Sequence, residues 1–110
     1  MSLTISEEED ENERLAAVFR ALAEPVRLRI LERLAHDDPP GKTGVCELAD
    51  SLGLPQPNVS HHLGILKGTG LVRCIKDSCK CYYIVNAAAL EAAIAALRRR
   101  ATPELPGKES

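Results

Sequence analysis

The chain has 110 residues, which is the size of a single folded domain. Hydrophobic residues make up 45% of it, but it has one Phe, two Tyr and no Trp. Its core must therefore be built from Leu, Ile, Val and Ala, which suits closely packed helices. The sequence has no run of roughly 18 uncharged apolar residues, and residues 1–10 lack the basic and apolar regions of a secretory signal. We therefore expect a cytoplasmic protein without a membrane span.

The net charge of −2 conceals an uneven distribution of charged residues. Six of the 16 acidic residues lie between Glu7 and Glu13, and the same stretch has no Lys or Arg. From Arg14 onward the remaining ten acids are outnumbered by 14 bases. A short acidic block of this kind is typical of a solvated tail, so residues 1–12 are expected to form a disordered acidic arm. The mildly basic remainder is compatible with DNA binding.

The first part of the chain predicts four helices and one loop. Apolar residues at helical spacing predict a first helix over residues 12–22. Pro25, a residue type favoured at the first helical position, begins a second helix. Residues 36–44 are rich in Asp, Pro and Gly and are predicted to form a loop. A short third helix is expected over residues 45–52, and a fourth over about 57–67, each ended by glycine.

The rest of the chain predicts a hairpin and a last helix. Two β-compatible runs, residues 71–75 and 80–85, flank a short polar turn. The last helix is expected over residues 87–100. Together these elements predict a mainly α fold with a small β-hairpin. They form one domain over residues 13–101, followed by a disordered tail over residues 102–110.

The third and fourth helices, separated by Gly-Leu-Pro, have the proportions of a helix-turn-helix, whose second helix enters the major groove of DNA. The polar face of that second helix would carry side chains suited to base edges and phosphates, namely Gln56, Asn58, Ser60, His61, His62 and Lys67. The hairpin would lie beside the duplex as a wing with three cations, Arg73, Lys76 and Lys80. The competing interpretation is an ordinary solvated face on a small helical domain.

Three stretches of sequence are distinctive in this order: ALAEPVRLRILERL, VCELADSLGLPQPNVSHHLGILKGTGLV and CYYIV. Their combination resembles the arsenic-repressor (ArsR/SmtB) family of bacterial transcriptional repressors, over about residues 14–100. The resemblance implies a winged helix-turn-helix with about five helices and a two-stranded wing. It also implies a homodimer, joined mainly through the first and last helices, that binds operator DNA when ligand-free and releases it when an inducer binds.

Two departures from the family pattern concern DNA affinity. Gly64 stands on the reading helix where family members often carry Lys, and a glycine inside a helix costs up to about 1 kcal/mol. At the wing tip, Ser78 and Cys79 replace the usual Gly-Arg, which removes an expected phosphate contact.

Cysteine placement is the basis for predicting the inducer. In a reducing compartment, four cysteines in a short chain favour metal or redox chemistry over structural disulfides. Metal-sensing family members commonly carry Cys-Val-Cys-Asp-Leu on the third helix, and the corresponding Gly-Val-Cys-Glu-Leu here keeps only Cys46. Cys46 is therefore either a further ligand or a small packing residue. Other family members bind zinc-type ions between paired last helices through Asp, His and Glu. That site is absent here, because the last helix has no His and only one acid, Glu91.

The other three cysteines lie within the predicted hairpin. With a turn centred on Asp77-Ser78, Cys74 is expected directly opposite Cys81, with Cys79 diagonally on the same face. Three thiolates on one surface suit a soft ion, and As(III) or Sb(III), bound by three sulfurs, is the predicted inducer. Tetrahedral Zn(II) or Cd(II) would need a fourth ligand, from Cys46 or the other subunit, and Pb(II) is a further alternative.

A redox interpretation competes with metal sensing. Cys74 and Cys81 are expected to lie close enough for a disulfide or polysulfide bridge, and Lys76 and Lys80 nearby would raise thiol reactivity. The alternative function is therefore a repressor that senses oxidants or reactive sulfur. An enzyme with a permanent cofactor is not expected, because the sequence has no Cys-x-x-Cys, no Gly-rich phosphate loop and no metal-ligand pair on a helix.

Overall fold

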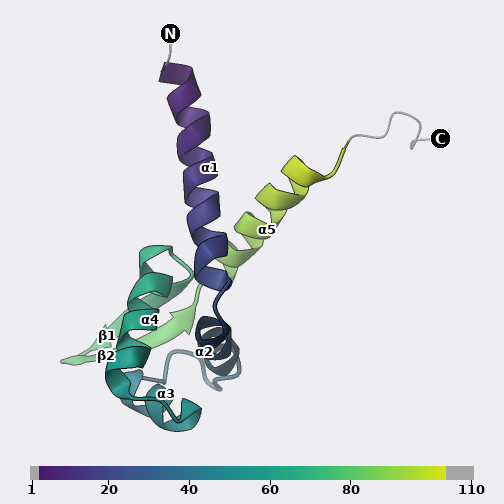
Figure 1. The fold of residues 1–110 in the computed structure, drawn as a ribbon. Coiled ribbons are helices and arrows are strands. Elements are labelled where there is room, and N and C mark those ends of the chain that lie inside the picture. The colour runs from purple at the N-terminus through teal and green to yellow at the C-terminus, as the bar shows by residue number, and fades with distance from the viewer. Residues whose placement is uncertain (1–2, 104–110) are drawn as a thin grey trace.

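The computed structural model describes residues 3–103, which form five α-helices and one two-stranded antiparallel sheet (Figure 1). This architecture confirms the predicted winged helix-turn-helix. No helix in the described part is long and apolar enough to cross a lipid bilayer. In chain order the elements are α1 Leu3–Leu22, α2 Pro25–Ala35, α3 Val45–Leu52, α4 Gln56–Gly68, β1 Val72–Asp77, β2 Lys80–Val85 and α5 Ala87–Ala101.

Helix α1 begins at Leu3, about nine residues earlier than the sequence indicated. The predicted disordered arm over residues 1–12 is thus wrong from residue 3 onward, and its first two residues lie outside the described part. Glu is a strong helix former, and Asp10 stands four residues before Arg14, the spacing at which opposite charges stabilise a helix. An acidic block can therefore be helical and solvated at once. Of the predicted C-terminal tail, residues 104–110 also lie outside the described part.

Local signals set the ends of the shorter helices. The Glu24 carboxylate accepts a hydrogen bond from the Arg27 N–H at 3.0 Å and caps α2, which begins at Pro25. Helix α3 has the predicted bounds, because Gly53 adopts the left-handed conformation, with φ of 69°, directly after it. The Asn86 side chain accepts from the Ala89 N–H at 3.2 Å and caps α5.

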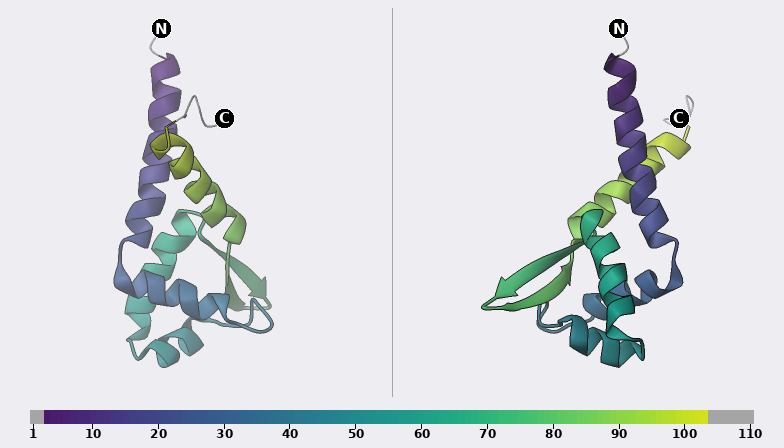
Figure 2. Two further views of the ribbon diagram at one scale, coloured as in Figure 1. Left: turned by 90° about the vertical axis from the view of Figure 1, so that its right-hand side faces the viewer. Right: turned by 60° about the vertical axis from the view of Figure 1, so that its left-hand side comes forward.

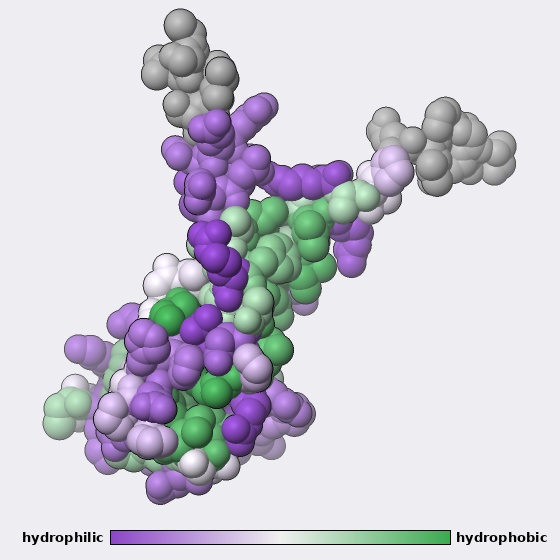
Figure 3. Space-filling model, in the orientation of Figure 1, coloured by the Kyte–Doolittle hydropathy of each residue, from purple (hydrophilic) through white to green (hydrophobic). Residues whose placement is uncertain are grey.

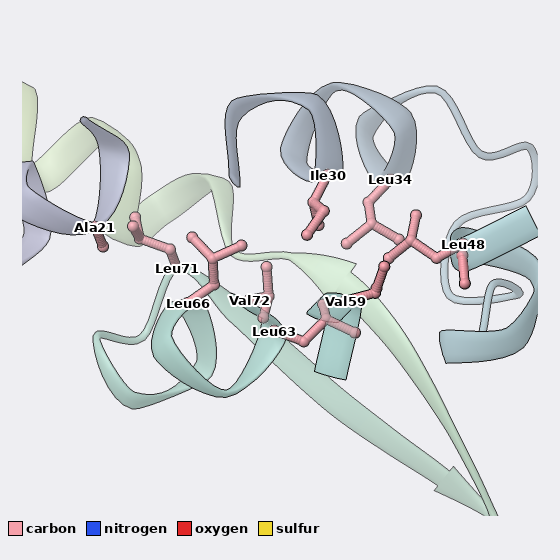
Figure 4. Packing of buried hydrophobic residues seen from close by; sticks show 10 residues of the cluster. Ala21, Ile30, Leu34, Leu48, Val59, Leu63, Leu66, Leu71 and Val72 are labelled. Carbon is pink, nitrogen blue, oxygen red and sulfur yellow. The ribbon is translucent and has the colours of Figure 1, made fainter. Parts of the chain in front are cut away.

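The core lies where α2, α3 and α4 meet the base of the hairpin (Figure 4). Its largest fully buried side chains come from all of these elements and from the residue preceding β1: Ile30, Leu48, Val59, Leu63, Leu66, Leu71 and Val72. Three of them lie on one face of α4, so burial of about 1.5–3 kcal/mol per side chain holds that helix against the body. The opposite face of α4 is left to solvent.

The long helices and the hairpin project away from this core in different directions. Figure 1 shows the upper halves of α1 and α5 diverging from the compact part, and Figure 2 shows the hairpin extending from it on another side. Helix α4 therefore belongs to the compact part, from which the hairpin protrudes on one side and the long helices α1 and α5 on another.

The hairpin has a different register from the predicted one. Its loop consists of Ser78 and Cys79, so that Cys74 is paired with Tyr83 and Lys76 with Cys81. Ser78 has φ of 62°, the positive value that a two-residue hairpin loop requires at its first position. The expected direct pairing of Cys74 with Cys81 is therefore wrong. The two residues remain on one face, as diagonal neighbours.

Candidate nucleic-acid interface and thiol site

Helices α3 and α4 present the predicted reading surface. The turn between them is closed by a hydrogen bond from the Leu54 N–H to the Ala49 carbonyl at 3.1 Å, and Pro55 precedes the first residue of α4. Burial of one face of α4 exposes the other. The exposed predicted residues on this helix are Gln56, Asn58, Ser60, His61 and Lys67. Amide, hydroxyl and imidazole groups at these positions can reach base edges or phosphates.

His62 does not belong to this exposed surface. Its side chain is 17% exposed, and its Nδ1 lies 3.2 Å from Nη1 of Arg27 and 3.8 Å from the Glu24 carboxylate. Its Nδ1 thus faces the start of α2, and its contact with DNA stays a prediction. The sequence held no local signal of this contact, since Arg27 lies 35 positions earlier.

The three predicted wing cations are all exposed, but they divide between two faces of the hairpin. Arg73 and Asp77 are four residues apart on β1 and therefore lie on the same face. Lys80 is paired with Asp77, so the register places Lys80 on that face as well. Lys76 lies on the opposite face together with Cys74 and Cys81. Nearer the base of the hairpin, that opposite face packs on the core through Val72 and Tyr83.

Two of the wing cysteines are joined in the structure. Cys74 and Cys81 are joined as a disulfide, with Cα atoms 5.8 Å apart. Cys79 is a free, exposed cysteine in the hairpin loop. Among the described residues there is no group of three or more His, Cys, Asp or Glu side chains placed to hold a metal ion. The structure therefore brings two of the three predicted sulfurs together.

The fourth cysteine lies between the wing and the reading helix. Cys46, free and exposed on α3, has its thiol 3.5 Å from Oε1 of Gln56, the first residue of α4. A hollow of about 160 Å³ separates the start of α3 from β2 and is lined by Cys46, Glu47, Lys80 and Cys81, among others. This closeness arises because the Tyr83 N–H donates to the Thr43 carbonyl at 2.9 Å, which ties the segment before α3 to the strand.

Helices α1 and α5 carry an exposed apolar surface. Ile94 and Leu97 are 39% and 44% exposed, and Figure 3 shows apolar residues along α5 facing solvent. A hollow of about 350 Å³ lies between the two helices, with Leu15 and Val18 among its lining residues. At its outer end Arg100 lies 3.8 Å from Glu11. Apolar side chains at helical spacing on a protruding helix are typical of a face that packs on another chain.

Comparisons with known proteins agree with this geometry. Residues 24–73 match the sequence profile described as bacterial regulatory protein, arsR family. An uncharacterized HTH-type transcriptional regulator of Methanocaldococcus jannaschii is 44% identical over 75 residues, covering 67% of this chain and 81% of that protein. The cadmium resistance transcriptional regulatory protein CadC of Listeria innocua is 32% identical over 72 residues, covering 66% of this chain. The chain spans about half the length of several such curated relatives, from 46 to 58%.

A solved structure extends the likeness to the whole fold. The ArsR-like transcriptional regulator from Rhodococcus sp. RHA1 superposes with a TM-score of 0.73 at 28% identity, covering 82% of this chain and 81% of that one. Helix α4 is exposed on one face, packs through its other face on a small core, and has a cationic hairpin beside it. This arrangement defines a winged helix-turn-helix DNA-binding transcriptional regulator rather than an enzyme. The chain belongs to the ArsR/SmtB family of such regulators.

Proposed function

We propose that this regulator is a cytoplasmic, homodimeric repressor that binds operator DNA and releases it when an inducer reacts with the wing thiols. The observation that carries the proposal is the closeness of Cys74 and Cys81, with Cα atoms 5.8 Å apart. Both lie on the hairpin that also bears Arg73 and Lys80. A chemical change at these sulfurs therefore acts within the element that is proposed to hold phosphates.

The proposed operator contact uses α4 and the wing together. The exposed face of α4 would enter the major groove, where amide and imidazole groups address base edges. Arg73 and Lys80, which share one face of the hairpin, would contact the phosphates beside it, whereas Lys76 lies on the opposite face. Because phosphate contacts release counterions and supply much of the binding free energy, turning these two cations away would lower operator affinity severalfold.

Dimerisation would use the exposed surface of α1 and α5. Two symmetry-related copies of that surface would cover Ile94 and Leu97, which are more than a third exposed in the single chain. A dimer also explains why a recognition unit this small would suffice, since two copies read two half-sites one helical turn apart.

The first candidate inducer is As(III) or Sb(III). Cys74 and Cys81, once reduced, would supply two sulfurs, and the third would come from Cys79 in the loop or from Cys46 across the hollow beside β2. Cd(II), Zn(II) or Pb(II) would use the same thiols with an additional ligand. Each thiol must lose its proton on binding, so inducer affinity should fall as the pH falls.

Oxidation is the second candidate, and the closeness of Cys74 and Cys81 supports it. The two thiols would give up two electrons and two protons to an oxidant such as a disulfide or persulfide, and the product would be a bridge between them. Joining the two strands across one face would stiffen the wing. Cys79, two residues from Cys81 and exposed, would be the thiol through which an oxidant enters.

A single release experiment separates these inducers. Reduced protein bound to a fluorescent duplex, selected by the protein from random DNA, would be titrated with arsenite, antimonite, cadmium, zinc and a persulfide donor. Ser variants of all four cysteines are compared, and those of Cys79 and Cys46 show which free, exposed thiol takes part. Release by arsenite that requires Cys74, Cys81 and one of these two thiols supports the metalloid. Release by the persulfide donor that requires Cys74 and Cys81, and that Cys79→Ser slows without abolishing, supports oxidation. If no reagent releases the DNA, the wing thiols are not the sensor.

A further inference from the structure

Arg27 joins three helices through its side chain. From its place in α2, its Nε donates to the Ala21 carbonyl at 2.7 Å and its Nη2 to the Arg20 carbonyl at 3.5 Å, both in the last turn of α1. Its Nη1 donates to Nδ1 of His62 on α4 at 3.2 Å. The Arg20 carbonyl also accepts from the Ala23 N–H at 3.2 Å, so the main contribution of Arg27 to the end of α1 is the donor for the Ala21 carbonyl, while it also holds the reading helix.

The chemistry of the contact sets the role of Nδ1 in His62. A guanidinium has five N–H donors and no acceptor, so in a hydrogen bond with Arg27 the Nδ1 atom is the acceptor. The side chain of His62 is 17% exposed, which limits competition from water. The guanidinium is planar and its donors diverge at fixed angles, so it can hold α1 and α4 in one relative orientation.

The remaining contacts of α4 do not set its rotation as strictly. Val59, Leu63 and Leu66 bury its inner face, but apolar burial is non-directional and depends on area. A hydrogen bond weakens steeply when its angle departs from linearity. His62 also directly follows His61, an exposed residue of the reading face, so any rotation of α4 that lengthens the Arg27–His62 contact also moves the groups that address DNA.

We propose that Arg27 and His62 are positioning residues that fix the orientation of the reading helix relative to the dimerisation helix α1. In this way they set the separation of the two reading helices on the operator. The inference rests on the proposed dimeric, operator-binding function. In a two-fold dimer a displacement of α4 relative to α1 acts in both subunits, so a small change alters the fit to two half-sites at a fixed spacing. Both residues fall within the sequence stretches that identify the family, and their contact gives those two positions a joint physical role.

The test compares three variants at one position. Asn places its side-chain oxygen where Nδ1 of His lies, whereas Gln extends its amide to the position of Nε2 and Ala has no acceptor. Each variant would be measured on the duplex that the wild-type protein selects from random DNA, and on the same duplex lengthened by one or two base pairs between half-sites. Melting temperature and the dimer dissociation constant are measured alongside.

We expect His62→Ala and His62→Gln to bind the selected duplex about tenfold or more weakly, as loss of a hydrogen bond to a charged group predicts. Their preference for the original spacing over the lengthened duplexes should shrink. His62→Asn should retain both the affinity and the preference. A positioning role predicts that the spacing preference changes. A loss of stability alone would leave the spacing preference of the folded molecules unchanged.

A second pair of measurements guards against misfolding. Arg27→Lys keeps the charge but lacks the planar fork that holds two partners at fixed angles, so it should reproduce the loss of spacing preference. Adding it to His62→Gln should cause little further loss. If His62→Asn and His62→Gln bind every duplex alike, or if the spacing preference of His62→Ala equals that of wild type, the inference is wrong and the proposed function stands. A wild-type protein that selects no sequence overturns both.

Discussion

Gly64, in the middle of the reading helix, is the position where one substitution should improve both stability and DNA binding. A Cβ built on Gly64 meets nothing within 4 Å, and the residue is exposed. Gly inside a helix is less favourable than Ala by about 0.5–1 kcal/mol, because it loses more backbone freedom on folding. Gly64→Ala should therefore raise the free energy of unfolding by that amount. The melting temperature should rise by about 2–8 °C, since 1 kcal/mol corresponds to about 4–8 °C for a domain of this size.

Gly64→Lys should give a similar rise in the free energy of unfolding and should also add a DNA contact. Position 64 lies four residues after Ser60 and three after His61, on the exposed reading face. If the lysine reaches one phosphate in each subunit, the slope of log affinity against log salt should steepen by about 0.9 per contact. The assay is a salt series of operator titrations by fluorescence anisotropy, with thermal melts of the same samples.

Gly70 provides the matched control. A Cβ there also meets nothing within 4 Å, but its φ of 81° lies in the left-handed region. Gly70→Ala should therefore destabilise the protein by about 1–2 kcal/mol. A melting temperature of Gly64→Ala at or below that of wild type would refute the reasoning, because it would mean that another surface approaches position 64 closely. An unchanged salt slope for Gly64→Lys would show that this position faces away from phosphates.

Three further changes test the reading face, the core and the dimer surface. Ser60→Ala combined with His61→Ala should weaken operator binding by about 1–3 kcal/mol in a gel-shift titration, with an unchanged melting temperature, and unaltered affinity would move the reading surface elsewhere. Leu63→Ala, at a side chain only 1% exposed, should lower the free energy of unfolding in urea by about 3–5 kcal/mol, and a loss below about 1 kcal/mol would contradict its core position. Ile94→Glu should shift the proposed dimer to monomer in sedimentation at micromolar protein, and a wild type that is monomeric there would count against the dimer.

Much of the fold could be predicted from local sequence signals. Helix α3 has the bounds expected from the glycine after it, and α2 begins at Pro25, as expected. These features depend on one residue's backbone preference or on the period of a few apolar residues, so they can be predicted from sequence alone. The exposure of Ser60 and His61 likewise follows from the buried positions of α4.

Other features depend on contacts between distant parts of the chain. The sequence pattern gave no reason to separate His62 from His61, and only the packing of α4 against α2 places His62 beside Arg27. The sequence was compatible with more than one hairpin turn, and the positive φ of Ser78 selects the register that makes Cys74 and Cys81 diagonal neighbours. Composition predicted a disordered acidic arm, but from Leu3 onward this segment is the first part of α1.

The position of Cys46 relative to the wing shows this division most clearly. On sequence grounds Cys46 was a lone cysteine on a short helix, 35 residues before Cys81. The Tyr83–Thr43 backbone hydrogen bond brings the start of α3 against β2, so the two cysteines line one hollow. Sequence alone determined where thiols stand in the chain and which polar side chains share one face of α4, because these are properties of residue type and local period. The tertiary structure decided which of them meet, because that depends on packing between segments far apart in the chain.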